Sequence, residues 1–121
     1  MQIALKGLVL LIAIEHLFIL WIEMFAWTTK GIKIVKGADR RFMEMTKGMA
    51  ANQGLYNGFL SAGLIWSLLI TDMIWSYNVA FFFLGCVIVA GTFGALSSSK
   101  AIFIKQALPA ILVTMTLLIF R

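Results

Sequence analysis

The 121-residue sequence has few charged residues, one cysteine and one proline, and these shortages exclude several classes of protein. Charged residues make up 12% of the chain and hydrophobic residues 62%, with a mean hydropathy of +1.00. A soluble domain has about a quarter charged residues and just under half apolar ones. A chain this short cannot bury so much apolar surface in its own core, which excludes a water-soluble domain. With Cys86 as the only cysteine, a secreted module built on disulfides is excluded as well.

Four apolar segments are each long enough to cross a membrane as a helix, which takes about 20 mostly apolar residues. They are continuous runs, without the alternation expected of a β-barrel. Pro109 lies inside the fourth segment, where we expect a kink. The pattern predicts an all-α, integral membrane four-helix bundle, a single multi-pass domain of the cell (plasma) membrane, with spans at about residues 3–27, 48–70, 78–96 and 101–120.

Basic residues are distributed unevenly between the two sides of these spans. The loop of residues 28–47 carries six of the ten, and two more, Lys100 and Lys105, are assigned to the third connection, at the start of the fourth span. Cytoplasmic loops are enriched in Lys and Arg, so we expect the loop inside the cell and both termini outside. This bias argues against a dimer of oppositely inserted copies and leaves a parallel homo-oligomer open. The bilayer is the expected partner of these residues, and nucleic acid is not.

Ionisable residues inside the first span predict a functional site, because such groups are costly in a membrane and usually face the protein interior. At 100° per residue, Glu15, His16 and Glu23 share one face of a helix within a 100° arc. Glu15 and Glu23 are about 12 Å apart along the axis, too far to share one metal ion. We therefore expect neither a metal nor a cofactor.

The second span has two faces of different character. Polar side chains occupy one arc, and small residues at intervals of four occupy another, where they favour close helix packing. The polar set is Asn52, Gln53, Tyr56 and Asn57, and the small set is Ala50, Gly54, Gly58 and Ala62.

Matching the depths of two antiparallel spans predicts which polar groups meet. Glu23 is expected level with Asn52 and Gln53. Glu15 and His16 are expected level with Asn57 and Ser61. Tyr56 falls between the two layers. The result is a ladder of polar groups from the cytoplasmic side to the middle of the membrane.

Three segments resemble the DUF1304 family of small bacterial and fungal four-span membrane proteins. They are Glu15–Leu17, Glu23–Thr29 and Ala51–Gly63, and the likeness extends over essentially the whole chain. The resemblance implies a four-span membrane fold and leaves the activity open.

Three functions fit the ladder. The first is proton-linked binding or transport of a small cationic or amphipathic molecule. In it Glu15 exchanges a proton for the ligand, His16 is its proton partner, and Tyr56 is a gate or a ligand contact. The second is an intramembrane acid–base enzyme acting on a lipid-like substrate. The third is a structural subunit that stabilises a partner in the membrane. The sequence favours the first by a narrow margin.

Overall fold

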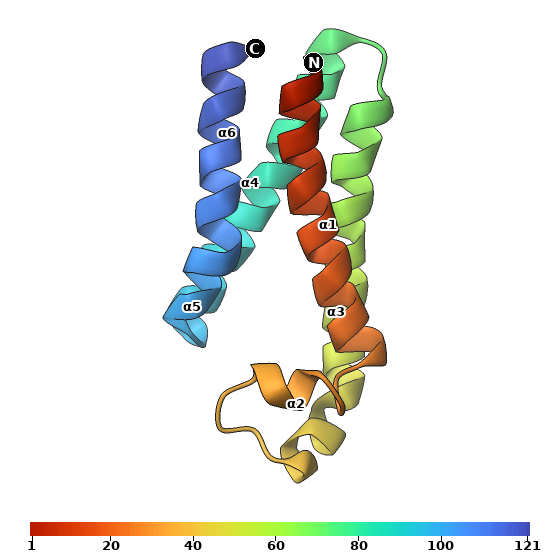
Figure 1. Ribbon diagram of the computed structural model, residues 1–121, viewed down its shortest axis with the longest axis vertical. Coiled ribbons are helices and arrows are strands. Elements are labelled where there is room, and N and C mark those ends of the chain that lie inside the picture. Colours follow the sequence, from red (N-terminus) through yellow and green to blue (C-terminus); the bar gives the residue numbers. More distant parts are fainter. The chain divides into compact units, whose positions relative to one another are not determined.

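The computed structural model describes all 121 residues, and its regular structure is entirely helical (Figure 1). This confirms the predicted all-α fold. The elements in chain order are α1 (Ile3–Phe25), α2 (Gly31–Ile34), α3 (Arg40–Leu69), α4 (Met73–Ser97), α5 (Lys100–Ile102), the π-helix η1 (Phe103–Ala107) and α6 (Leu108–Phe120).

Three helices are long and apolar enough to cross a membrane: α1, α4 and the continuous stretch Lys100–Phe120. At 30 residues α3 is also long enough, but its polar side chains make it less apolar than the other three. That α3 contains the second membrane span therefore stays a prediction.

The chain divides into two compact units, and both α1 and α3 contribute residues to each. Unit 1 consists of Met1–Ala13 and Ala62–Arg121, and unit 2 is Ile14–Ser61.

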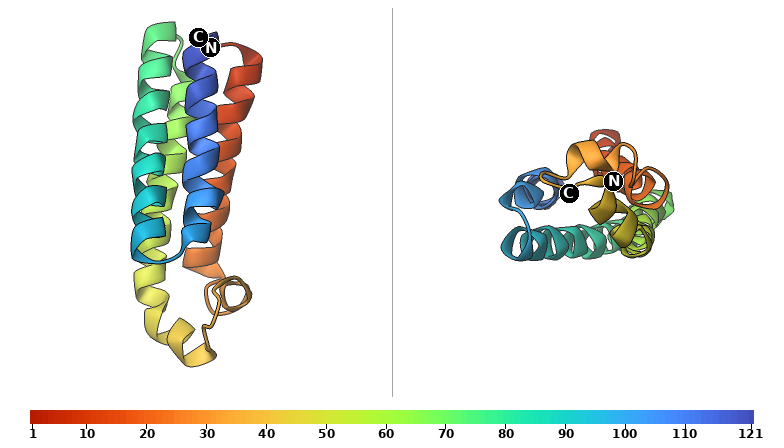
Figure 2. Two further views of the ribbon diagram at one scale, coloured as in Figure 1. Left: turned by 90° about the vertical axis from the view of Figure 1, so that its left-hand side faces the viewer. Right: turned by 90° about the horizontal axis from the view of Figure 1, so that it is seen from below.

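Unit 1 is a four-helix bundle made by the start of α1, the end of α3, α4, and the α5–η1–α6 stretch (Figure 2). Lys6 Nζ donates a hydrogen bond to the carbonyl of Leu68, which joins α1 to α3 over 3.3 Å. The buried hydroxyl of Ser76 donates to the carbonyl of Ser67 and joins α4 to α3 over 2.8 Å. The bundle is filled by apolar side chains that include Val9, Leu64, Leu84, Val87, Val113 and Leu117.

Both chain ends lie at the same end of unit 1. The side-chain amide of Gln2 donates to the carbonyl of Phe120 over 3.5 Å, and Figure 2 shows the two termini side by side. The side of a membrane that they face stays a prediction.

The helix starts differ from the predicted span limits at two places. Because the carboxylate of Asp72 caps α4 by accepting a hydrogen bond from the backbone N–H of Trp75, this helix begins at Met73, five residues before the predicted span. Helix α3 begins at Arg40, eight residues before its predicted span. Its first turns are polar, and a helix can continue past the apolar part of its sequence.

The expected irregularity at Pro109 takes the form of a π-helix. Pro109 has no N–H to donate to the carbonyl of Lys105, four residues earlier, so the regular α-helical pattern cannot continue through this point. The preceding residues, Phe103–Ala107, form the wider turns of η1, and α6 then begins at Leu108.

Candidate functional site

Unit 2 contains all seven residues of the predicted polar site. The second half of α1 and the first half of α3 lie side by side and antiparallel in it: Leu20 lies against Gly58, and Met24 against Gly54. The connection between the helices, residues 26–39, includes the single turn α2.

Two glycines bring these helices close together. A Cβ atom added to Gly54 would lie 2.8 Å from Cγ of Met24 and 3.2 Å from the backbone oxygen of Leu20. A Cβ added to Gly58 would lie 2.6 Å from Cδ1 of Leu20. A larger side chain at Gly54 would meet the backbone of α1, whereas at Gly58 the Leu20 side chain would have to move, so Gly54 marks where the helices pack most closely.

Ala50 is buried on the same face of α3, whereas Ala62 is exposed. Ala50, Gly54 and Gly58 thus lie along the packed face. Ala62, the fourth small residue of the predicted set, does not.

Glu23 is the best-defined polar residue of the site. Its side chain is 7% exposed, and Oε1 accepts a hydrogen bond from Nδ2 of Asn57 over 2.8 Å. The same Asn57 nitrogen lies 3.2 Å from the carbonyl of Gln53 and also donates to it. No Lys or Arg of unit 2 pairs with Glu23, so a neutral amide is the partner of this buried carboxylate.

The contacts agree with the predicted depth of Glu23 but give it a different partner. A Cβ on Gly54, next to Gln53, would lie 3.0 Å from Cβ of Glu23, close to the expected level of Asn52 and Gln53. The side chain that hydrogen-bonds Glu23 is nevertheless Asn57, about one helical turn beyond Gln53 along α3. The close contacts at Gly54 and Gly58 set this register. Asn57 lies about 60° from Gly54 around the helix, at the edge of the packed face.

The other polar residues of the site lie in different surroundings. His16 is buried, with 1% of its surface exposed, and it makes a polar contact, so it is not a free group. Glu15 is half-buried, and its carboxylate has no hydrogen-bond or ion-pair partner within unit 2. Three of the predicted site residues are exposed and do not meet Glu23. They are Asn52, Gln53 and Tyr56.

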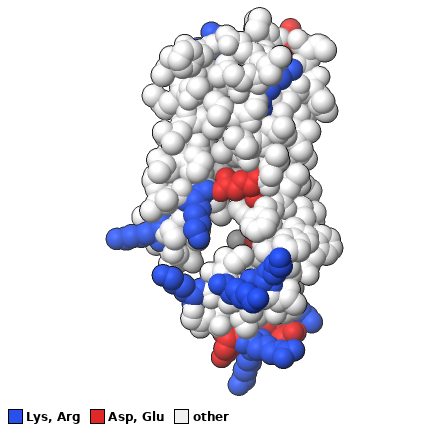
Figure 3. Space-filling view, viewed as in Figure 1, with Lys and Arg blue, Asp and Glu red and all other residues white.

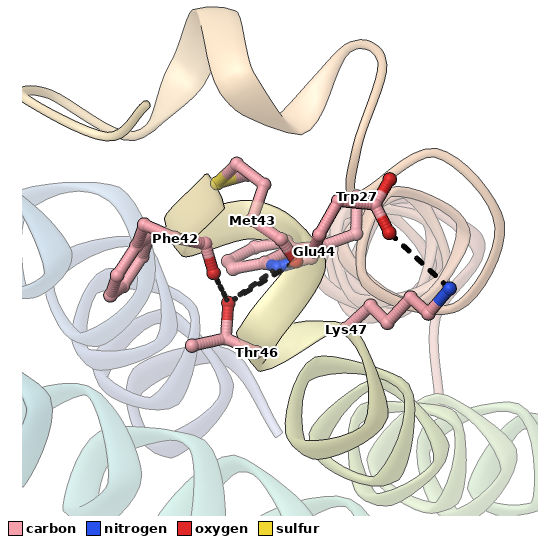
Figure 4. Close-up of polar contacts among 6 residues, drawn as sticks. All are labelled: Trp27, Phe42, Met43, Glu44, Thr46 and Lys47. Atoms are coloured by element: carbon pink, nitrogen blue, oxygen red, sulfur yellow. Dashed lines mark hydrogen bonds and ion pairs between the residues drawn. The ribbon is translucent and has the colours of Figure 1, made fainter. Parts of the chain in front are cut away.

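One polar contact of unit 2 was missed by the sequence analysis. The indole Nε1 of Trp27 donates to Oγ1 of Thr46 over 3.0 Å, and that hydroxyl donates to the carbonyl of Phe42 over 2.7 Å (Figure 4). A Trp at the end of an apolar helix indicates a ring near the membrane interface. The sequence does not show that Thr46 is the partner of this indole, because that depends on how α3 is aligned against α1.

No group of three or more His, Cys, Asp or Glu side chains has the arrangement of a metal site. The chemistry that the residues of unit 2 offer is thus proton exchange and hydrogen bonding at Glu15, His16, Glu23 and Asn57.

The fold and this polar cluster define an all-helical chain with membrane-compatible helices and buried ionisable groups. The chain belongs to the family described as "Protein of unknown function (DUF1304)", which matches residues 10–118. It is 30% identical over 105 residues to "Uncharacterized protein YpaA" of Lactococcus lactis subsp. lactis (strain IL1403), covering 85% of this chain and 87% of that protein. No solved structure matches the chain.

Proposed function

We propose that the chain is a multi-pass protein of the cell membrane that binds a small cationic or amphipathic molecule in exchange for a proton. One observation carries the proposal: the carboxylate of Glu23 is buried on an apolar helix, and its partner in unit 2 is an amide rather than a cation.

An ionised carboxylate in an apolar environment is costly unless a proton or a cation neutralises it. Asn57 is compatible with both forms of Glu23, because its N–H donates equally to a carboxylate oxygen and to the carbonyl oxygen of the protonated acid. The site can therefore hold a proton in the resting protein and a ligand cation in the bound one.

Glu15 supplies a second carboxylate on the same helix, eight residues earlier and so about 12 Å away along the axis. Because it is half-buried and without a partner in unit 2, we assign it the transfer of the proton between Glu23 and water. In this proposal the exposed polar groups of Asn52, Gln53 and Tyr56 contact the ligand on its way to the site.

Proton release on ligand binding tests this function. Purified protein in detergent, in a weakly buffered solution, is titrated with the lipophilic cation tetraphenylphosphonium while the pH is recorded. We expect protons to be released by the wild type and not by Glu23→Gln. The matched control is Glu44→Gln, because Glu44 is an exposed carboxylate that pairs with Lys47. Failure of the wild type to release protons with this cation or with other amphipathic cations would contradict the proposal.

A structural subunit is the second candidate, and the close packing at Gly54 favours it. The hydrogen bond from Asn57 to Glu23 joins α1 to α3 beside that contact, so the same residues can serve as a folding contact. Gln at position 23 can still accept this hydrogen bond. In a purely structural role Glu23→Gln would retain full stability, and neither protein would release protons.

A further inference from the structure

We propose that the loop between α1 and α3 is a docking surface for the anionic headgroups of phospholipids. The surface, called here the basic platform, consists of Lys30, Lys33, Lys36, Arg40 and Arg41 with the apolar side chains between and beside them. The proposal shares the membrane location proposed above but does not depend on ligand binding at Glu15 or Glu23.

The cations of the platform have no counter-ions in unit 2. The segment 28–47 has six basic residues, and Lys47 pairs with Glu44 over 3.3 Å, which leaves five. The only other acidic residue, Asp39, accepts a hydrogen bond from the backbone N–H of Phe42 over 2.8 Å. All five cations are exposed, and Figure 3 shows Lys and Arg side chains gathered around α2 and the start of α3.

Two of these cations do not stabilise the helix that carries them. Arg40 and Arg41 occupy the first turn of α3, where the helix dipole disfavours positive charge. An anion outside the chain would offset this unfavourable interaction.

Apolar side chains beside the cations favour a lipid surface over a soluble polyanion. Ile34 is 51% exposed, and Met45 and Met49 are 73% and 76% exposed. A nucleic acid offers such side chains no apolar environment. The boundary between headgroups and acyl chains accommodates both the cations and the apolar groups, as it does for interfacial helices.

The platform is held in place before any ligand binds. Trp27 is hydrogen-bonded to Thr46, and Gly31 of α2 lies so close to α3 that an added Cβ would be 3.1 Å from Cε of Met43. Met43 itself is fully buried. These contacts reduce the backbone entropy that is lost when headgroups bind.

The platform also lies at the right height for headgroups. Helix α1 has 23 residues and is about 34 Å long, enough to cross a hydrocarbon core of about 30 Å. Helix α2 begins at Gly31, only six residues beyond its end, and so lies in the headgroup region.

Tryptophan quenching by brominated lipids measures which lipids surround the platform. The reporter is the full chain carrying Trp66→Phe and Trp75→Phe, so that only Trp21 and Trp27 of unit 2 remain. It is reconstituted in phosphatidylcholine bilayers with a minor fraction of phosphatidylglycerol in both leaflets. Two samples are compared at equal total bromine. In one the acyl chains of phosphatidylglycerol are brominated, and in the other those of phosphatidylcholine.

We expect stronger quenching when the bromine is on phosphatidylglycerol. Neutralising a cation should lower this preference by up to about fivefold, from the attraction of one basic residue to an anionic membrane surface. The variant Lys33→Gln, Lys36→Gln, Arg40→Gln, Arg41→Gln should lose it, and the matched variant Lys100→Gln, Lys105→Gln of unit 1 should keep it. High salt should weaken the preference in the unmodified platform, which tests the charge effect without any substitution.

Equal quenching by the two brominated lipids would overturn the proposal. So would a preference that persists in both the four-residue variant and high salt. Inorganic phosphate added at constant ionic strength tests whether the platform binds free phosphate rather than lipid headgroups. If a low concentration of phosphate abolishes the preference for phosphatidylglycerol, the platform is a site for a soluble anion instead. The four-residue variant should still release protons with tetraphenylphosphonium, so either proposal can fail without the other.

Discussion

Asn57 is the residue on which the polar site of unit 2 depends most directly. Its amide is the hydrogen-bond donor from α3 to the buried carboxylate of Glu23, and it lies at the edge of the packed face that carries Gly54 and Gly58. Asn57 is itself only partly buried.

We expect Asn57→Ala to lower the free energy of unfolding by about 1–3 kcal/mol, because Glu23 would be left buried without its hydrogen bond. Denaturant unfolding in detergent, followed by circular dichroism, measures the change. Gln53→Ala is the matched control, since this amide is exposed on the same helix. Its effect should stay within about 0.5 kcal/mol. If both variants lose the same free energy of unfolding, the hydrogen bond from Asn57 to Glu23 does not contribute more to stability than the exposed amide of Gln53.

At the scale of the elements, the backbones of α4 and η1 approach each other closely in unit 1. A Cβ on Gly91 would lie 2.8 Å from the backbone nitrogen of Ala107 and 2.9 Å from its Cβ. The obstacle is backbone rather than the end of a flexible side chain. The two elements would have to separate to make room.

Gly91→Ala should therefore destabilise the protein by about 1–3 kcal/mol, the usual cost of overpacking. Gly85→Ala on the same helix is the control, because an added Cβ meets nothing within 4 Å there. Ala is the better helix former, so this variant should be neutral or more stable. Thermal unfolding of both proteins in one detergent compares them, and a fully stable Gly91→Ala would refute the close approach.

The loop of unit 2 gives a prediction about local rather than global stability. Trp27→Phe keeps an aromatic ring but removes the N–H that Thr46 accepts, so the loop should open more often. Trypsin, which cleaves after the loop's Lys and Arg, should cut the variant faster. Trp75→Phe in unit 1 should be cut at the wild-type rate. If trypsin cuts Trp27→Phe no faster than the wild type, the hydrogen bond of the indole does not hold the loop closed.

The sequence was sufficient to predict the helices but not how they contact one another. Long apolar runs identify α1, α4 and the Lys100–Phe120 stretch, since crossing a membrane requires such runs. The register of α1 against α3 depends on the contacts of Gly54 and Gly58, which periodicity alone cannot locate along the partner helix. Glu23 lies beside Gly54, within two residues of the predicted level at Asn52 and Gln53, but its hydrogen-bond partner, Asn57, was not predicted. Likewise, Pro109 predicted an irregularity without predicting its π-helical form.

For the whole molecule, the positions of the two termini determine how many times the chain can cross a membrane. The hydrogen bond between Gln2 and Phe120 places both termini at one end of unit 1. Two ends on the same side require an even number of crossings, whereas only three helices are clearly apolar enough. We therefore expect α3 to be the fourth crossing, with its polar side chains facing protein, ligand or headgroups rather than acyl chains.

Single cysteines on either side of α3 test this crossing. In a Cys86→Ala background, which removes the only native thiol, one variant carries Lys36→Cys and the other Thr71→Cys. A membrane-impermeant maleimide should label the Thr71 variant in intact spheroplasts and the Lys36 variant only after lysis, because we expect a loop rich in Lys and Arg to stay in the cytoplasm. Labelling of both before lysis, or of neither, would place the two positions on one side of the membrane, so α3 would not cross it. Labelling of the Lys36 variant alone would keep four crossings but reverse the orientation, and the charge bias of the loops would then not determine it.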